Sequence, residues 1–327
     1  MLQFILRRVL MAIPTMFVIS IVSFILIQLP PGDFLTAYTA TLSQQGDIIP
    51  PEQLEALREA YGLGQPMYVQ YFKWMRGIFR GDFGQSLEWG MPVKDLIWER
   101  LALTIVLSGA TFLFVWTLAI PIGVYSATHQ YSFFDYLFTF FGFLGLGIPN
   151  FMLALVLMWV GYAYFGQDVG GLFSPEYKNA PWSLARIWDM IRHLWIPMLV
   201  LGTAGTAGLI RTMRANTLDE VNQPYVETAR AKGLTEGEVI RKYPVRVALN
   251  PFVSTAGWAL PELVSGATIV AVVLSLPTVG PLLLRALLSQ DMYLAGAIIL
   301  LISILTIIGT LISDILLAWL DPRIRYE

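Results

Sequence analysis

The sequence predicts an all-α polytopic membrane protein with six transmembrane helices. Charged residues make up 13% of the 327 residues, about half of the ~25% that is usual in soluble domains. The mean hydropathy is +0.63, and such a chain has too little polar surface to cover a globule in water. The third observation is a series of six long apolar runs, because about 20 apolar residues cross the ~30 Å hydrocarbon core as a helix.

The first apolar run covers residues 9–29 and follows a basic start at Arg7 and Arg8. It is longer than the ~7–15 residues of a secretory signal's apolar region, and no small-residue cleavage site follows it. The run ends instead in Pro30-Pro31-Gly32-Asp33. We therefore expect residues 1–29 to be a cytoplasmic N-terminus and a retained first transmembrane helix.

Residues 30–100 form the longest segment between apolar runs, and we expect them on the extracytoplasmic side. Residues 52–62 have the pattern of an amphipathic helix. Residues 66–87 mix aromatic side chains with cations, which is typical of an interfacial helix whose cations reach toward water. A docking surface for an external partner is the alternative for this second stretch.

Residues 101–327 hold the five further spans. The apolar runs lie at residues 101–127, 133–165, 194–217, 249–275 and 294–320. The run at 133–165 is long enough to tilt or kink, and Pro149 is the expected place. Residues 276–288 are apolar but too short to span and are broken by prolines, so we expect a re-entrant or interfacial element there.

The positions of Lys and Arg predict the orientation, because cytoplasmic loops are enriched in these residues. With the N-terminus inside, the inner segments contain Arg7, Arg8, Arg211, Arg214, Arg230, Lys232, Arg241, Lys242, Arg246, Arg323 and Arg325. The short outer loops contain Lys178, Arg186, Arg192 and Arg285. This bias predicts that both termini and the loop at 218–246 are cytoplasmic.

The loop at 218–246 contains the polar stretch YVETARAKGL at residues 225–234. Pro224 suits the first turn of a helix, and Gly233 suits the position after its end, where a positive φ is needed. Thr235 and Glu238 then have the spacing of a capping box. The loop is therefore predicted to form a helix, a Gly turn and a second helix.

This first loop helix has the composition of a protein-docking surface. Ala229 and Ala231 let another protein approach closely, and charged residues lie at the edges. A helix on the membrane surface would have a larger apolar face and more cations. A solvated loop, or a helix lying on the anionic leaflet, is the alternative.

The same residues resemble a known family. Glu227-Thr228-Ala229 with Gly233 is similar to the EAA-x-x-x-G loop of ABC importer permeases, and the flanks resemble the oligopeptide, dipeptide and nickel permease branch. The resemblance runs almost end to end. It includes the LRR start at 6–8, Pro31-Gly32-Asp33, YGLGQPMYVQYFKW at 61–74, GDFGQSL at 81–87, Ile148-Pro149-Asn150-Phe151 and LDPRIRY at 320–326.

The resemblance implies the type I ABC importer permease fold and a role in ATP-driven import. In that family, the loop helix docks into a groove on a cytoplasmic ATPase. The residues thereby implied in ATPase coupling are Tyr225, Glu227, Thr228, Ala229, Arg230, Ala231, Lys232, Gly233 and Leu234. Thr228 and Asn250 depart from the usual Ala and Leu, and Pro244 interrupts a stretch that is usually helical, so the second inner helix is expected to differ in shape.

The resemblance also implies the partners and the location. They are a homologous second permease in a heterodimer, two cytoplasmic ABC ATPase subunits and an extracytoplasmic solute-binding protein, in a prokaryotic inner membrane. The sequence has no G-x-x-x-x-G-K-[ST] loop for nucleotide phosphates. We therefore expect no cofactor on this chain, with ATP and Mg²⁺ bound by the partner ATPases.

Other functional classes lack their motifs. The net charge of −2 gives no basic face for nucleic acid. The chain has no cysteine, and His129 and His193 lie far apart, so we expect no metal site. Neither a G-x-S-x-G elbow nor an HExxH motif is present, so we expect no catalytic residues and no enzyme activity. An ATP-independent channel or secondary transporter is the alternative of a different class.

Three residues are candidates for the translocation path: Glu262, Trp258 and Asn150. Glu262 lies near the middle of the fifth run, where a charged carboxylate costs about 2.5–3.5 kcal/mol on insertion scales and should face protein or water. A carboxylate that is protonated or paired within the bundle is the alternative.

Short peptides are the expected solute, because the resemblance is to peptide permeases. Oligosaccharides are the main alternative, since peptide-type permeases also serve sugar importers and Ala271 stands where the family usually has Glu. Trp116, Trp159 and Trp258 would suit stacking on sugars, and they would equally suit packing. Nickel chelates and opines are further alternatives.

Overall fold

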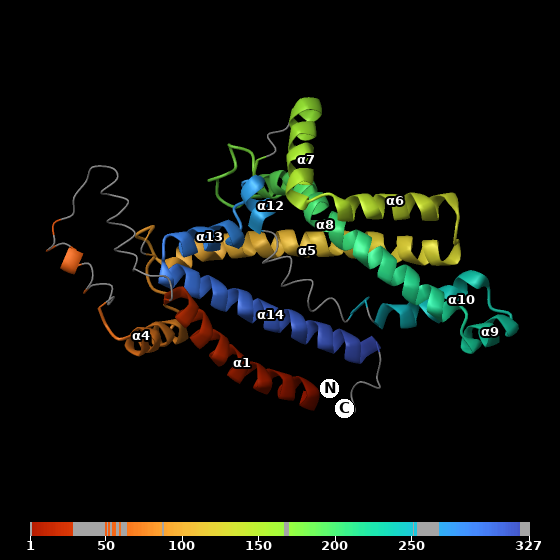
Figure 1. Ribbon diagram of the computed structural model, residues 1–327, viewed down its shortest axis with the longest axis horizontal. Helices are drawn as coiled ribbons and strands as arrows, with labels where there is room; N and C mark the ends of the chain where they lie inside the picture. Colours follow the sequence, from red (N-terminus) through yellow and green to blue (C-terminus); the bar gives the residue numbers. More distant parts are fainter. Residues whose placement is uncertain are drawn as a thin grey trace. The chain divides into compact units, whose positions relative to one another are not determined.

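The computed structural model describes residues 2–28, 50, 52, 54–56, 59, 64–86, 88–166, 170–250, 252–253 and 268–320. These residues are predominantly helical, and the β-structure among them is an isolated bridge between Gln85 and Pro92. The predicted all-α class is thereby confirmed. The helices (Figure 1) are α1 (Leu2–Gln28), α4 (Met67–Phe79), α5 (Val93–Thr128), α6 (Phe133–Gly147), α7 (Asn150–Phe165), α8 (Leu184–Val221), α9 (Pro224–Ala231), α10 (Glu236–Lys242), α12 (Thr268–Val273), α13 (Val279–Leu288) and α14 (Met292–Leu320).

Four helices in the described part of the chain are long and apolar enough to cross a membrane. These segments are Leu6–Ile25 of α1, Val93–Thr128, Leu184–Val221 and Met292–Leu317 of α14. They correspond to the first, second, fourth and sixth predicted spans. The predicted fifth span at 249–275 lies largely outside the described residues, so the number of six stays a prediction.

The third predicted span, at 133–165, is a pair of helices rather than one tilted helix. The chain bends by 105° between α6 and α7, and Figure 1 shows α7 directed steeply away from α6. The break lies at Pro149, as predicted, because proline has no N–H and keeps the residue before it extended. With 15 and 16 residues rising about 1.5 Å each, neither helix alone covers the ~30 Å hydrocarbon core.

The chain forms two compact units, which are described separately. Unit 1 is built from residues 105–277 with residues 1–5 and 308–327, and unit 2 from residues 6–104 and 278–307. In unit 1, α6, α7 and α12 pack against α8. Gly145 of α6 allows close approach, because a Cβ there would lie 2.6 Å from Cγ2 of Thr203 in α8. Small residues at contacts are typical of helices that pack within a membrane.

Unit 2 has its core between the first turns of α5, helix α13 and the first half of α14. Asp291, just before α14, is fully buried and accepts hydrogen bonds from Ser86 Oγ and from the N–H groups of Glu88 and Leu294. These bonds tie the loop before α5 to the start of α14. The short apolar element predicted at 276–288 is confirmed as α13.

Helix α4 confirms the helix predicted within residues 66–87. Its buried Tyr71 and Trp74 pack with Phe24 of α1 and with Met292 and Leu300 of α14. Its remaining residues are mostly exposed. The amphipathic helix predicted at 52–62 lies largely outside the described residues.

Candidate functional site

Helix α9 is bounded by the two signals that the sequence shows. Pro224 is its first residue, where the missing N–H costs no hydrogen bond. The helix ends at Ala231, and Gly233 has a φ of +81°, a left-handed conformation that favours glycine. The chain reverses there and α10 begins three residues later. The predicted order of helix, Gly turn and helix is confirmed.

The start of α10 is held by the predicted capping box. The Thr235 N–H and hydroxyl donate to Oε2 of Glu238 at 3.2 and 2.8 Å. These hydrogen bonds lower the pKa of Glu238 below its usual value. α10 ends at Lys242, Tyr243 leaves the helical pattern, and helix resumes at Pro244. The predicted interruption at Pro244 is confirmed.

A small apolar cluster fastens α9 to α10. Val226, Ala229 and Val239 are buried, and Leu234 and Tyr243 pack against them. From the sequence we expected Ala229 to lie on a surface that another protein can approach. The structure shows it 3% exposed instead, because it faces α10. Val226, which is fully buried, is the anchor that sequence reasoning missed, although its spacing of three residues from Ala229 marks one helix face.

The outward face of α9 is polar and exposed. It carries Glu227, Thr228, Ala231 and Lys232. Arg230 lies at the edge, and its guanidinium forms two hydrogen bonds with the Glu236 carboxylate, at 3.0 and 2.7 Å. This pairing raises the pKa of Arg230 and lowers that of Glu236. Both groups therefore keep their charges around neutral pH.

Tyr225 fixes the junction between α8 and α9. Its hydroxyl donates to Oε2 of Glu220, near the end of α8. Partial burial and the neighbouring Glu220 carboxylate raise the pKa of Tyr225 to about 12. The hydroxyl therefore stays protonated at physiological pH and continues to donate.

Arg214 of α8 binds a partner that the sequence did not predict. From the sequence, the position of Arg211 and Arg214 at the inner end of the fourth predicted span predicts contacts with headgroups or with the 218–246 loop. Arg214 instead donates from Nε and Nη2 to the two carboxylate oxygens of Asp135 in α6, at 3.1 and 3.0 Å. Asp135 is 3% exposed and also accepts the N–H of Tyr131. The expectation for Arg214 is wrong, because its helix face points to the start of α6.

The candidates for the translocation path are only partly described. Glu262 and Trp258 lie outside the described residues, and Asn150 is the first, half-buried residue of α7 after the bend at Pro149. Trp116, one of the aromatic residues considered for sugar stacking, packs against Phe112 and Phe252 with ring centroids 4.7 Å away in each case. Its ring is thus part of the packing of unit 1.

The described residues contain no group of three or more His, Asp or Glu that could hold a metal ion.

The structure brings Tyr225, Glu227, Thr228, Ala229, Arg230, Ala231, Lys232, Gly233 and Leu234 together in one compact hairpin of α9 and α10. We call this hairpin, residues 224–242, the α9–α10 hairpin.

The chain is similar to known membrane transport proteins. Residues 119–326 match the family described as "Binding-protein-dependent transport system inner membrane component", and residues 1–108 match its N-terminal component. The chain is 39% identical to the oligopeptide transport system permease protein AppB of Bacillus subtilis (strain 168), with all of both chains covered. It is 32% identical to the oligopeptide permease protein OppB of Haemophilus influenzae and 31% identical to the dipeptide permease protein DppB of Alkalihalophilus pseudofirmus, again over the full lengths.

Proposed function

Because this chain belongs to the family of binding-protein-dependent transport system inner membrane components, we propose that it is the membrane-spanning permease subunit of an ATP-driven importer of short peptides. The observation that carries this proposal is the full-length similarity to oligopeptide and dipeptide permease proteins. The helices that are long and apolar enough to span support a multi-pass protein of the inner membrane.

This chain forms the transport path, and ATP hydrolysis by other subunits supplies the energy. It has no phosphate-binding loop, so we assign ATP and Mg²⁺ to two cytoplasmic ATPase subunits. A second permease and an extracytoplasmic solute-binding protein complete the importer. The bias of Lys and Arg supports cytoplasmic termini and a cytoplasmic 218–246 loop.

The α9–α10 hairpin is the proposed contact with an ATPase subunit. Its apolar cluster makes α9 and α10 one rigid body, while Glu227, Thr228 and Ala231 face outward. Only Asn222 and Gln223 separate α9 from the 38-residue helix α8. A push on the hairpin therefore acts on α8 and on the helices packed against it in unit 1, which is how a local movement becomes a change of access.

Reconstitution tests the proposed function. The complete importer, with its ATPases and binding protein in proteoliposomes, should accumulate a labelled short peptide only when ATP is supplied. An oligosaccharide of similar mass should not accumulate, since the relatives are peptide permeases and Trp116 is used in packing. Peptide entry through this chain alone, without ATP, would instead identify a channel or secondary transporter.

Glu262→Gln tests the proposed path. If Glu262 lines the route, loss of its charge should lower peptide uptake about tenfold or change peptide preference, because removal of one charge-assisted contact costs about 1.5–3 kcal/mol. Uptake would be measured over a peptide panel, with Asp314→Asn as the matched carboxylate control within α14. Unchanged uptake and preference would assign Glu262 to packing within the bundle.

A further inference from the structure

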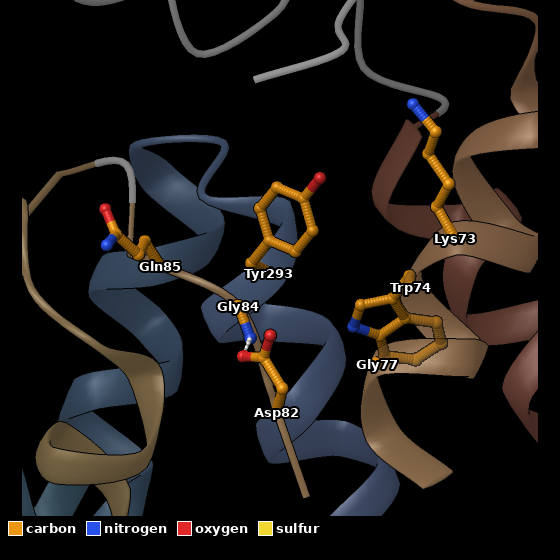
Figure 2. Close-up of a pocket in the computed structure, with 7 residues that line it drawn as sticks. All are labelled: Lys73, Trp74, Gly77, Asp82, Gly84, Gln85 and Tyr293. Carbon is orange, nitrogen blue, oxygen red and sulfur yellow. Dashed lines mark hydrogen bonds between the residues drawn. The ribbon is translucent and has the colours of Figure 1, made fainter. Parts of the chain in front are cut away.

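Unit 2 contains a pocket of about 290 Å³ between α4, the loop that follows it and the start of α14. Figure 2 shows its lining residues, which are Lys73, Trp74, Gly77, Asp82, Gly84, Gln85 and Tyr293. The pocket does not involve the α9–α10 hairpin or any path candidate. Its lining combines a cation, a carboxylate and two aromatic side chains with polar atoms.

Trp74 gives this pocket an unused hydrogen-bond donor. The side chain is 4% exposed, and its ring is fixed against Phe24 and Tyr71, with centroids 5.7 and 6.3 Å away. Its Nε1–H is buried and finds no hydrogen-bond partner in the described structure. Figure 2 shows this nitrogen on the side of the ring that faces Asp82 and Gly84. A buried donor without a partner costs free energy, so an acceptor from outside the chain would relieve it.

The backbone of the pocket packs tightly against the side chain of Tyr293. Gly84 has a φ of +81°, and a Cβ there would lie 2.9 Å from the Tyr293 ring. Its N–H donates to Oδ1 of Asp82 at 2.9 Å, which aims the carboxylate and leaves lone pairs for another donor. Lys73 and Tyr293 extend toward the same side of the pocket in Figure 2. The lining thus offers donors that suit an anion, on Lys73 and Trp74, and a carboxylate that suits a cation, on Asp82.

The position of the pocket indicates the source of such a ligand. The first candidate span ends at Ile25, one residue after the Phe24 that packs on Trp74, and Tyr293 is the second residue of the last candidate span. The pocket therefore lies where two spans meet the membrane–water boundary. Headgroups lie at this level, and Trp, Tyr and Lys are the residues that anchor there.

From these observations we propose that the pocket binds the headgroup of an aminophospholipid of the phosphatidylethanolamine type. The Lys73 ammonium and the Trp74 Nε1–H bind the phosphate, and the Asp82 carboxylate accepts the lipid's ammonium N–H groups. Phosphatidylcholine offers the same phosphate but has no N–H to donate, and phosphatidylglycerol has no cation. The pocket should therefore prefer phosphatidylethanolamine to both.

The test uses the intact importer, purified from vesicles that contain equal amounts of the three lipids and washed in detergent. Mass spectrometry of the retained lipid should show phosphatidylethanolamine enriched about tenfold over each of the others. Trp74→Phe, which keeps a ring but removes the N–H, and Lys73→Met should each lower the total amount of retained lipid severalfold, because each removes a contact to the phosphate that all three lipids share. Asp82→Asn should remove the preference over phosphatidylglycerol, because the ammonium loses its ionic partner.

Trp98→Phe and Lys94→Met are the matched controls, because both residues lie at exposed positions early in α5 and outside the pocket. They should leave both the amount of retained lipid and the enrichment unchanged. Equal retention of the three lipids by the unaltered importer would overturn the proposal. Recovery of bound peptide in place of lipid would overturn it too, as would control variants that lose as much lipid as Trp74→Phe.

Discussion

Replacing Gly233 by Val should lower ATP-driven peptide uptake about tenfold while the importer still assembles. Gly233 has a φ of +81°, and a β-branched residue in that conformation costs about 1–3 kcal/mol, where about 1.4 kcal/mol corresponds to a factor of ten. The strain would reorient α9 relative to α10 and so misplace the face that meets the ATPase. Uptake and the stimulation of ATP hydrolysis by loaded binding protein would both be measured.

The same hairpin offers the control for this experiment. Gly237 lies in α10 and, unlike Gly233, does not have a positive φ. Both glycines have open space where a Cβ would be added. Gly237→Val should therefore retain most of the uptake. Gly233→Asn should fall between the two variants, since Asn tolerates a left-handed conformation better than Val. Equal losses in Gly233→Val and Gly237→Val would contradict the conformational argument.

Arg214→Met should cost about 3 kcal/mol of stability, the lower end of the range for breaking a buried ion pair by removing one partner. Asp135 is 3% exposed, so the variant would leave its carboxylate buried without the guanidinium. Arg214 is itself 29% exposed, and for this reason we take the lower end of the range. Unfolding by a denaturing detergent, followed by tryptophan fluorescence, would measure the loss.

Two further variants separate the ion pair from other effects of this substitution. Asp135→Leu combined with Arg214→Met should recover much of the stability, because no charge is then left unpaired. Arg211→Met, at an exposed position one turn earlier, should change stability by less than about 0.5 kcal/mol. A double variant that is less stable than Arg214→Met would show that the pair is not the source of the loss.

The features predicted well from the sequence were those encoded within a few neighbouring residues. Pro224, Gly233 and the Thr235–Glu238 pair each dictate the conformation of their own turn, so the hairpin followed from the sequence alone. The break at Pro149 was predictable for the same reason. Long apolar runs likewise identified the four helices of the described residues that are long and apolar enough to cross a membrane.

Helix ends and contacts between distant residues were not predictable in this way. α8 begins at Leu184, ten residues before the apolar run expected at residue 194, and its first turn contains the buried Arg186. That guanidinium lies 4.3 and 4.6 Å from the rings of Trp182 and Phe173 and donates to Ala180 O. A hydropathy scale counts this arginine as polar, so the residue falls outside the predicted apolar run. Similarly, the partner of Arg214 lies 79 residues away, and no local pattern reveals it.

The central proposal is that the α9–α10 hairpin is the surface on which an ATPase subunit acts. The chain has no cysteine, so a single cysteine at the exposed position of Ala231 would react alone within this chain. In the assembled importer, Ala231→Cys should form a cross-link to the ATPase subunit whose yield changes when ATP binds. A cysteine at the exposed Asn179 should form none and should react with a membrane-impermeant reagent from outside. The account would be contradicted if the cysteine at position 231 formed no cross-link to the ATPase subunit. It would also be contradicted if that cysteine reacted with the membrane-impermeant reagent from outside.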